Sequence, residues 1–435
     1  MSSVGIGLCG LGTVSSGVIN VLARNANTIG MRAGTAIEIR HIGARRDNPS
    51  VDTSSYKVSR DIFAVVEDPA VDIVVELIGG YEPARELVLK AIANGKHVVT
   101  ANKALIAEHG NEIFAAAEAK GVNVAFEAGV AGGIPIIKAL REGLAGNEIS
   151  SLAGIINGTG NFIMTEMRDK GRAFEDVLKE AQELGYAEAD PTFDVEGIDA
   201  AQKLVILAAI AFGVPLDFSK AYTEGITNID LADVSYAEEL GYRIKHLGIA
   251  RRSEAGIEMR VHPTLIPSSR LIANVNGVKN AVLVQGDAVG PTLYYGAGAG
   301  AEPTASAVLA DITDVARDIA GGNSNRVAPL NRSQAQLGKA KYLPIDDVCC
   351  AFYLRLQVAD KPGVLATVTQ MLSDQGISIE ALVQKEAQGS DNSVPLIMLT
   401  NVTQEKTMNA AIESLEASEV VVAKIIRHRV ESLEG

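Results

Sequence analysis

Two charged side chains four residues apart, Asp199 and Lys203, stand at the start of an apolar segment that ends near Phe212. Residues with this spacing share one face of a helix, and the Ala, Leu, Ile and Gln residues of the segment favour helix. A pair of this kind at the entry to a buried helix can form the polar floor of a pocket. A lysine ammonium placed there stabilises negative charge that develops on a substrate oxygen, and it can deliver a proton.

Two further acids, Glu188 and Asp194, precede this helix and could complete the same pocket floor. An ordinary surface ion pair at the solvated end of a core helix is the alternative for Asp199 and Lys203. Such pairs are common and contribute little free energy. The rest of the chain has to decide between the two interpretations.

A second candidate site lies near the N-terminus, where an apolar strand at 4–8 leads into a Gly-rich turn and then a helical pattern. The turn consists of Gly10, Leu11, Gly12, Thr13 and Val14. This order of elements is the context of dinucleotide binding, in which Gly10 permits the tight turn and Gly12 lets the backbone approach the pyrophosphate. Ser15 replaces the third glycine of the fingerprint, which could loosen the packing of helix on strand. A purely structural turn is the alternative.

The end of the second predicted strand, 36–42, bears on the choice of nucleotide. Arg45 and Arg46 follow this strand. An acid here would suit NAD, whereas arginine suits the 2′-phosphate of NADP. Arg45 is therefore the candidate contact, and the sequence favours NADP over NAD. Two solvated loop arginines are the alternative.

Further strands at 71–77, 97–101 and 122–126 alternate with helices at 83–93 and 106–120. This alternation predicts a Rossmann-type, doubly wound α/β domain over residues 1–128. Lys103 follows the strand at 97–101, at the carboxyl end where open parallel sheets bind ligands. Its cation can face the nicotinamide and the substrate carbonyl.

A Gly-rich loop from Glu127 to Pro135 ends this domain. It is either a domain hinge or a set of backbone carbonyls that, with Glu127, surrounds a hard cation. Beyond it we expect a helix at 136–142 and then strands at 149–156, 242–250, 257–266 and 281–284. Few long helices separate these later strands, which predicts a mixed or antiparallel sheet in an α+β substrate domain over residues 129–300.

A second Gly-rich turn, which contains Gly300, precedes a predicted helix at 301–320. The turn could abut the cofactor, and the helix could pack back on the first domain. Residues 321–345 are polar and aperiodic, which indicates a linker. Residues 346–435 follow the pattern β-α-β-β-α-β of a ferredoxin-like domain.

The composition excludes several classes of partner. The formal net charge of −14 argues against nucleic acid and anionic membrane surfaces. The three cysteines, Cys9, Cys349 and Cys350, form no plausible disulfide framework or metal site. No apolar run reaches transmembrane length and the N-terminus has no signal-peptide features, so we expect a cytoplasmic protein.

Several motifs in order along the chain resemble those of one enzyme family. They are Gly10-Leu-Gly-Thr-Val, Thr100-Ala-Asn-Lys103, Glu127-Ala-Gly-Val-Ala-Gly-Gly-Ile-Pro135, Asn157-Gly-Thr-Gly-Asn161, Gly185-Tyr-Ala-Glu188, and Asp194 followed by Gly197-Ile-Asp199-Ala-Ala-Gln-Lys203. Over nearly its whole length the chain resembles homoserine dehydrogenase in its monofunctional form with a C-terminal ACT domain. The resemblance implies reversible, NAD(P)-dependent interconversion of L-homoserine and L-aspartate 4-semialdehyde in threonine, methionine and isoleucine biosynthesis.

The resemblance also implies a role for each site. Lys203 is the implied acid/base, while Asp199 and Glu188 hold substrate groups with the support of Asp194. Lys103 is implied to lie on the cofactor side and to be a second catalytic candidate. The implied cofactor contacts are Gly10, Leu11, Gly12, Thr13, Val14, Arg45, Thr100, Lys103 and Gly300.

The family further implies a monovalent cation, usually sodium, and an amino-acid effector such as threonine. The cation residues would be Glu127, Val130, Gly132 and Ile134, and the effector residues Asp360, Gly363, Val364, Leu365 and Ile377. The ACT domain implies a homo-oligomer, dimer or tetramer. A domain that serves only dimerisation is the alternative.

Two rival functions remain open at this point. A dehydrogenase for another amino-acid semialdehyde is one, although a semialdehyde dehydrogenase would need a nucleophilic cysteine in the substrate region, where the chain has none. The other is a non-catalytic amino-acid sensor with a relic catalytic domain. The presence of Lys103, Asp199 and Lys203 argues against such decay.

Overall fold

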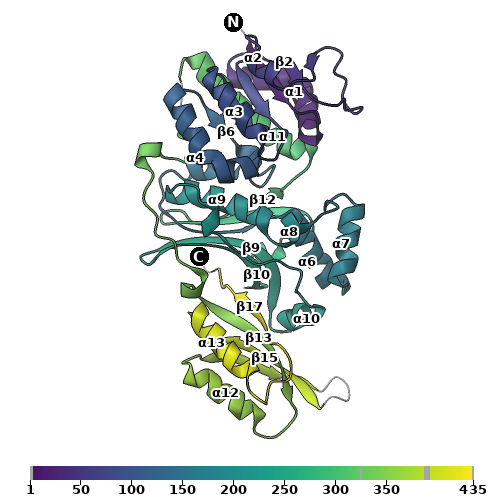
Figure 1. Cartoon of the computed structure of the whole chain (residues 1–435), viewed down its shortest axis with the longest axis vertical. Helices are drawn as coiled ribbons and strands as arrows, with labels where there is room; N and C mark the ends of the chain where they lie inside the picture. Colours follow the sequence, from purple (N-terminus) through teal and green to yellow (C-terminus); the bar gives the residue numbers. More distant parts are fainter. Residues whose placement is uncertain (1–2, 324–325, 387–391, 434–435) are drawn as a thin grey trace.

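The computed structural model of the protein describes residues 3–323, 326–386 and 392–433. Its helices and strands form three groups along the long axis of the molecule (Figure 1). An N-terminal α/β group occupies one end, a sheet with flanking helices the middle, and the C-terminal group the other end.

The N-terminal group contains a six-stranded parallel sheet in the order β3-β2-β1-β4-β5-β6. The strands are β1 (Val4–Cys9), β2 (Ile37–Gly43), β3 (Lys57–Ser59), β4 (Ile73–Glu76), β5 (His97–Thr100) and β6 (Val124–Ala125). The intervening helices are α1 (Thr13–Ala33), α2 (Phe63–Glu67), α3 (Ala84–Ala93) and α4 (Lys103–Lys120). This order confirms the predicted doubly wound fold, and its topological switch point lies between β1 and β4.

A helix from much later in the chain, α11 (Ala301–Gly321), completes the N-terminal group. It packs against α1, and Val18, Leu22, Val308 and Ile312 belong to one buried cluster. Gly17 makes the close approach possible, because a Cβ there would lie 2.3 Å from the carbonyl oxygen of Ala301.

The central sheet is mixed and mainly antiparallel, as predicted. Its strands are β7 (Ile149–Ile155), β8 (Tyr222–Thr223), β9 (Tyr242–Ser253), β10 (Gly256–Pro267), β11 (Lys279–Gly286) and β12 (Gly290–Ala297). Strands β9 and β10 form one long hairpin. The flanking helices are α5 (Ile136–Lys138), α6 (Gly158–Lys170), α7 (Phe174–Glu183), α8 (Thr192–Val195), α9 (Ile198–Phe212) and α10 (Leu231–Glu239). The helix predicted at 136–142 differs: after α5 the chain widens into a π turn, η2 (Ala139–Gly143).

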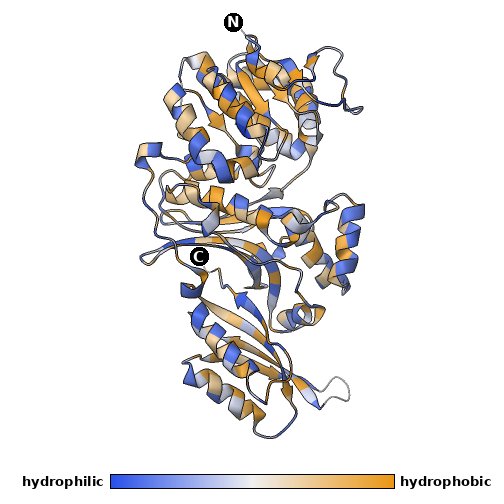
Figure 2. Ribbon diagram, viewed as in Figure 1, coloured by the Kyte–Doolittle hydropathy of each residue, from blue (hydrophilic) through white to orange (hydrophobic). Residues whose placement is uncertain are grey.

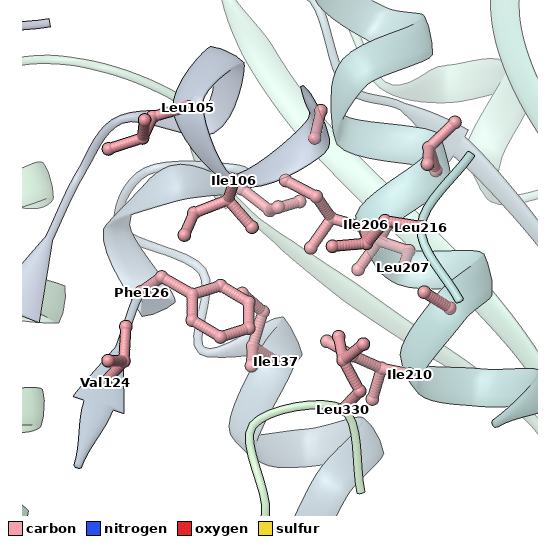
Figure 3. Close-up of a cluster of buried hydrophobic side chains, with 14 of the residues drawn as sticks. Leu105, Ile106, Val124, Phe126, Ile137, Ile206, Leu207, Ile210, Leu216 and Leu330 are labelled. Carbon is pink, nitrogen blue, oxygen red and sulfur yellow. The ribbon is translucent and has the colours of Figure 1, made fainter. Parts of the chain in front are cut away.

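Helix α9 connects the central group to the N-terminal group. It is apolar almost all round, and Ile206, Leu207 and Ile210 pack in one cluster with Leu105 and Ile106 of α4 (Figure 3). Burial of side chains this large stabilises the contact by roughly 1.5–3 kcal/mol each. The start of α9 is thereby fixed relative to the start of α4.

The C-terminal group has the predicted β-α-β-β-α-β order. Its elements are β13 (Cys349–Ala359), α12 (Val364–Asp374), β14 (Ile379–Gln384), β15 (Ser393–Thr400), the short β16 (Thr403–Gln404), α13 (Glu405–Glu416) and β17 (Ile426–Val430). Strand β17 also pairs with β10, in parallel, with Thr264 opposite Arg429 and Leu265 opposite Val430. One eleven-stranded sheet therefore runs through the central and C-terminal groups.

Short 3-10 turns connect several elements: η1 (Glu127–Gly129), η3 (Phe218–Lys220), η4 (Ile272–Asn274), η5 (Gln334–Gln336) and η6 (Ile345–Asp347). Of the predicted linker, residues 324–325 lie outside the described residues. The end of the linker is tied to β10, because Ile257 donates to the Lys341 carbonyl and Leu343 donates to the Ile257 carbonyl, both at 2.8 Å.

Each of the three groups has an apolar interior and a hydrophilic outer surface (Figure 2). Apolar residues concentrate in the strands and on the helix faces that cover them, while the outer helix faces are hydrophilic (Figure 2). Within the described ranges, no helix combines the length and the apolar character that a membrane crossing requires.

Candidate active site

A cleft of about 610 Å³ lies between the N-terminal and central groups. It collects residues from distant parts of the sequence, and six of the predicted catalytic, substrate and cofactor residues are among them. They are Lys103, Glu188, Asp194, Asp199, Lys203 and, through its backbone, Gly300.

Asp199 is the centre of the charged cluster in the cleft. Its Oδ2 accepts from the Lys203 ammonium at 2.7 Å, and its Oδ1 lies 3.2 Å from Lys103 Nζ. Lys203 also donates to the Ile156 carbonyl at 2.8 Å. The side chains of Asp199 and Lys203 are only 9% and 12% exposed, so they are not the solvated surface pair of the alternative interpretation.

Helix packing explains how Lys103 reaches Asp199. Lys103 is the first residue of α4 and Asp199 the second of α9, and the apolar cluster of Figure 3 holds these two helices together. Gly197 caps α9 in the left-handed conformation, with φ of 82°. That turn brings the acid-rich stretch back over the cleft.

Asn157 is a polar contact that the sequence analysis did not assign to the site. It is 6% exposed and caps α6 through its Oδ1, which accepts from the Gly160 amide at 2.7 Å. Its Nδ2 donates to Asp194 at 2.7 Å and to Asp199 at 2.8 Å. An Asn between a strand and a helix start is a recognisable capping signal, but the sequence does not reveal its two carboxylate partners.

The two aspartates differ in electrostatic environment. Burial opposes ionisation of Asp199, but the charges of Lys203 and Lys103 outweigh it and hold the pKa of this carboxyl below its usual value. Burial raises the pKa of Asp194, and the negative charge of Asp199 adds to the rise. The site thus keeps one firmly ionised carboxylate beside one that protonates more readily.

Glu188 lies in the loop between α7 and α8 and is exposed at the cleft. Among the residues that the structure describes, its carboxylate has no hydrogen-bond or ion-pair partner. The loop rests on α6, because the Thr159 hydroxyl donates to the Tyr186 carbonyl at 2.7 Å and the Tyr186 ring packs edge-on against Phe162. Glu188 is therefore free to contact a bound molecule.

The Gly-rich turn has the geometry that nucleotide binding needs. Gly10 has φ of 104°, and a Cβ there would lie 2.8 Å from the Leu77 carbonyl oxygen. Gly12 precedes the first residue of α1 and faces open space. Ser15 is buried and donates to the Gly10 carbonyl at 2.9 Å, so it fastens the turn where looser packing was expected. Leu11, Thr13 and Val14 complete the turn.

Asn48 was not predicted as part of this region. Its Nδ2 donates to the Leu11 carbonyl at 3.1 Å and to the Ser16 hydroxyl at 2.9 Å, which ties the loop after β2 to the Gly-rich turn. In the same loop Arg45 and Arg46 are exposed and form no ion pair with any described residue. Arg45 therefore lies near the turn with its charge unpaired.

Thr100 is placed differently from a typical ligand contact. It is fully buried at the end of β5, and its hydroxyl donates to Glu76 at 2.5 Å. The other Glu76 oxygen accepts from the amides of Ile78 and Gly79. Thr100 thus shapes the carboxyl edge of the sheet through Glu76.

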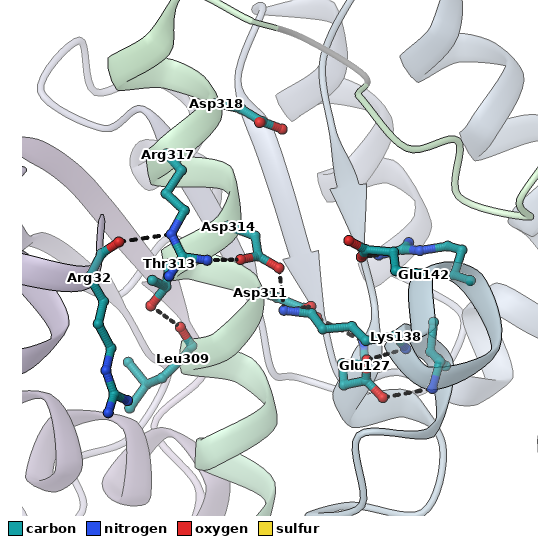
Figure 4. Close-up of polar contacts among 12 residues, drawn as sticks. Arg32, Glu127, Lys138, Glu142, Leu309, Asp311, Thr313, Asp314, Arg317 and Asp318 are labelled. Carbon is teal, nitrogen blue, oxygen red and sulfur yellow. Dashed lines mark hydrogen bonds and ion pairs between the residues drawn. The ribbon is translucent and has the colours of Figure 1, made fainter. Parts of the chain in front are cut away.

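The predicted cation loop offers fewer oxygens than expected. The Glu127 carboxylate accepts from the amides of Ile137 and Lys138, both at 2.8 Å, and its own amide donates to Asp311 at 2.7 Å (Figure 4). Burial and the nearby Asp311 charge raise the pKa of Glu127 to about 7. This carboxylate caps α5 and does not fit the role of a cation ligand.

The carbonyls of the same loop remain candidates. Ile134 accepts from the Ile136 amide and Glu127 from the Val130 amide, whereas no hydrogen bond from a described residue reaches the carbonyls of Val130 and Gly132. Within the described ranges, no three His, Cys, Asp or Glu side chains gather in a metal-binding arrangement. The loop therefore has peptide oxygens, and no side chain, to offer a cation.

The predicted effector residues lie at the two ends of α12, and all but Ile377 are at its first turn. Asp360, Gly363 and Leu365 are exposed, while Val364 and Ile377 are buried in the core of the C-terminal group. Gly363 precedes the helix with φ of 92°. Four of the five residues therefore lie together, whereas Ile377 follows the last turn of α12, where its amide donates to the Leu372 carbonyl at 3.0 Å.

Comparison with protein families assigns each group of elements. A model of the homoserine dehydrogenase NAD-binding domain matches residues 10–127, a model of homoserine dehydrogenase matches residues 135–313, and a model of the ACT domain matches residues 352–419.

Full-length relatives agree with these matches. Homoserine dehydrogenase of Pseudomonas aeruginosa is 64% identical over 433 residues, and that of Neisseria gonorrhoeae is 54% identical over 439, with 100% of both chains covered in each case. A homoserine dehydrogenase structure from Thiobacillus denitrificans is 61% identical, with a TM-score of 0.94, and covers 100% of this chain and 99% of its own. The chain belongs to the homoserine dehydrogenase family of oxidoreductases.

Proposed function

We propose that the cleft interconverts L-homoserine and L-aspartate 4-semialdehyde, with Lys203 as the acid/base. The observation that carries this proposal is the Lys103–Asp199–Lys203 cluster, with contacts of 3.2 and 2.7 Å. Reduction of an aldehyde builds negative charge on its oxygen, and an ammonium already in place stabilises that charge and supplies a proton. A bound nicotinamide nucleotide supplies the hydride.

The remaining side chains of the cleft are proposed to hold the substrate. Asp199 orients both lysines, while Glu188 and Asp194 bind the substrate ammonium. The free carboxylate of Glu188 supports this assignment. Lys103 is proposed to face the nicotinamide side of the cleft, because it opens α4 at the carboxyl end of the parallel sheet.

NADP is the proposed cofactor, with NAD as the alternative. The support is the unpaired Arg45 beside the Gly-rich turn, since a guanidinium binds a 2′-phosphate with two hydrogen bonds. A hyperthermophilic archaeal homoserine dehydrogenase, 26% identical with a TM-score of 0.61, has been solved in complex with NADPH. The turn, Thr100 and Gly300 are proposed to surround the rest of the dinucleotide.

A sodium ion is proposed at the carbonyls of the 127–135 loop, without a contribution from the Glu127 side chain. An amino-acid effector, threonine by preference, is proposed at the first turn of α12, where exposed polar and buried apolar residues meet. Homo-oligomerisation and a cytoplasmic location complete the proposal. An ACT domain that serves only to associate subunits would bind no threonine.

Initial rates of homoserine oxidation, followed by nicotinamide absorbance, test the proposal. NAD and NADP are compared in parallel, with wild type and Arg45→Ala and with threonine added. We expect NADP to be preferred and the variant to lose roughly 10-fold or more in NADP affinity, since charge-assisted hydrogen bonds contribute about 1.5–3 kcal/mol. An unchanged preference in the variant would exclude Arg45, and threonine without effect would leave the C-terminal domain an associative role.

A further inference from the structure

A buried arginine joins the C-terminal group to the central group. Arg429 of β17 is 1% exposed. Its guanidinium donates to both oxygens of the Glu405 carboxylate, at 2.9 and 2.6 Å, and to Glu224 at 2.7 Å. Glu405 opens α13, whereas Glu224 follows β8 in the central group. Charge-assisted pairs with this geometry are strong and directional.

The loop that begins at Glu224 continues directly to the active site. Two residues on, the Ile226 amide donates to the Val195 carbonyl at 2.8 Å. Gly225 lies so close that a Cβ there would be 2.6 Å from the same carbonyl oxygen. Val195 is the last residue of α8 and follows Asp194, whose carboxylate faces the cleft.

A second contact runs from the same loop to the start of α9. His246 is buried on β9, and its Nε2 donates to the Glu224 carbonyl at 3.0 Å. Its ring lies against Gly197, where a Cβ would be 3.1 Å from His246 Cε1. Gly197 immediately precedes α9, two residues before Asp199. Glu224 is thus connected to the backbone that carries both aspartates of the site.

We propose that Glu224, held by the Arg429 that Glu405 also binds, is a positioning residue for Asp194 and Asp199, and that the C-terminal domain acts on the active site through this contact. The inference rests on the proposed roles of the two aspartates. Helix α13 runs from this contact to the other end of the domain: the amide of its first residue, Glu405, donates to the Val348 carbonyl at the start of β13. Beyond its last turn the Val420 carbonyl accepts from the Ala359 amide, just before α12, so a ligand at the first turn of α12 would lie at the far end of α13.

Two charge-neutralising variants, Glu224→Gln and Glu405→Gln, test the proposal, and neither residue lines the cleft. We expect the KM for homoserine to rise about threefold to tenfold, as for residues coupled within one network. The KM for NADP should stay the same, since the nucleotide turn is remote. The acid limb of the kcat/KM profile should shift, because the geometry around Asp194 changes.

Glu239→Gln is the matched control. Glu239 forms an ion pair with Lys385 across the same boundary, away from α8, so this variant should retain wild-type kinetics. Gly225→Ala is a second test, which disturbs the loop against Val195 while leaving the arginine pairs in place. It should raise the homoserine KM in the same way even if the charge variants fold poorly.

One outcome would contradict the inference. If all three test variants match Glu239→Gln in homoserine KM and pH profile, with at most a lower Tm, the Arg429 contact only stabilises the fold and the inference is wrong. Failure of the proposed function would be recognised by a different result, because the Lys203→Ala variant would then retain turnover. In the Glu224→Gln variant, half-inhibition should require a higher threonine concentration than in wild type. The Kd of threonine, measured by calorimetry, should be unchanged.

Discussion

At the scale of single residues, Asp199 lies between two lysines, one from its own helix and one from a helix far earlier in the chain. The spacing of Asp199 and Lys203 predicts one helix face, and both line the cleft. The contact between Lys103 and Asp199 depends on the packing of two helices almost 100 positions apart, which periodicity does not encode. The same limit applies to Asn157, whose two carboxylate partners come from helices α8 and α9.

Replacement of the proposed acid/base should separate chemistry from binding. Lys203→Ala should lower kcat about 100-fold or more, within the usual contribution of a positioned acid/base. The KM for the nucleotide should not change, because Lys203 lies on the substrate side. Initial rates with saturating NADP measure both constants. A kcat within twofold of wild type would exclude the acid/base role.

The pair of aspartates predicts a pH effect. Asn157→Asp adds a third carboxylate beside Asp194 and Asp199, and like charges raise the pKa of each. If catalysis needs the ionised form, the acid limb of kcat/KM should move to higher pH by about one unit. Asn157→Ala, which removes the hydrogen bonds without adding charge, should shift less. Superimposable profiles for Asn157→Asp and wild type would contradict the assignment.

At the scale of elements, the sequence predicts the Gly-rich turn and the helix after it, and the structure confirms both. The packing of the 301–320 helix against the first domain was one option that the sequence left open. The missing third glycine is explained by the Ser15 hydroxyl, which bonds to the Gly10 carbonyl. The glycine that close packing demands is Gly17, and it faces α11. A fingerprint that describes helix against strand contains no information about a helix returning from position 301.

This packing predicts opposite effects of two Gly→Ala changes in α1. Gly17→Ala places a Cβ 2.3 Å from the Ala301 carbonyl oxygen and should cost about 1–3 kcal/mol through overpacking. Gly30→Ala has its nearest atom at 3.5 Å and should gain up to about 1 kcal/mol of helix propensity. Thermal unfolding compares the two. Equal Tm values for the two variants would show that α11 shifts to make room for the extra methyl group at position 17.

At the scale of the whole molecule, the order of the three groups follows from the sequence, but the continuity of the sheet does not. Strand patterns at 257–266 and 420–430 show apolar alternation without naming a partner. Only the folded chain pairs Thr264 with Arg429. A shared apolar cluster accompanies the pairing, with Phe162 and Leu265 beside Tyr353 and Leu399.

Removal of residues 346–435 should therefore damage more than regulation. The truncation exposes the β10 edge, uncovers part of the shared cluster and leaves the buried Arg260 without Glu431. An unpaired edge and an unpaired buried charge both favour aggregation. Size-exclusion chromatography and Tm measure the result, with Glu239→Gln as the folded reference. A monodisperse truncation with full activity would contradict this expectation.

The position of α11 in the chain has a consequence for synthesis on the ribosome. The N-terminal sheet emerges first, yet the helix that covers α1 is translated only at residues 301–321, after nearly the whole central group. Domains usually fold as they emerge, N-terminal first. Here the apolar face of α1 stays uncovered while the 267 residues between α1 and α11 (34–300) are added, at roughly 5–20 residues per second. Nascent chains stalled before residue 301 should bind chaperones more strongly than chains stalled after residue 321.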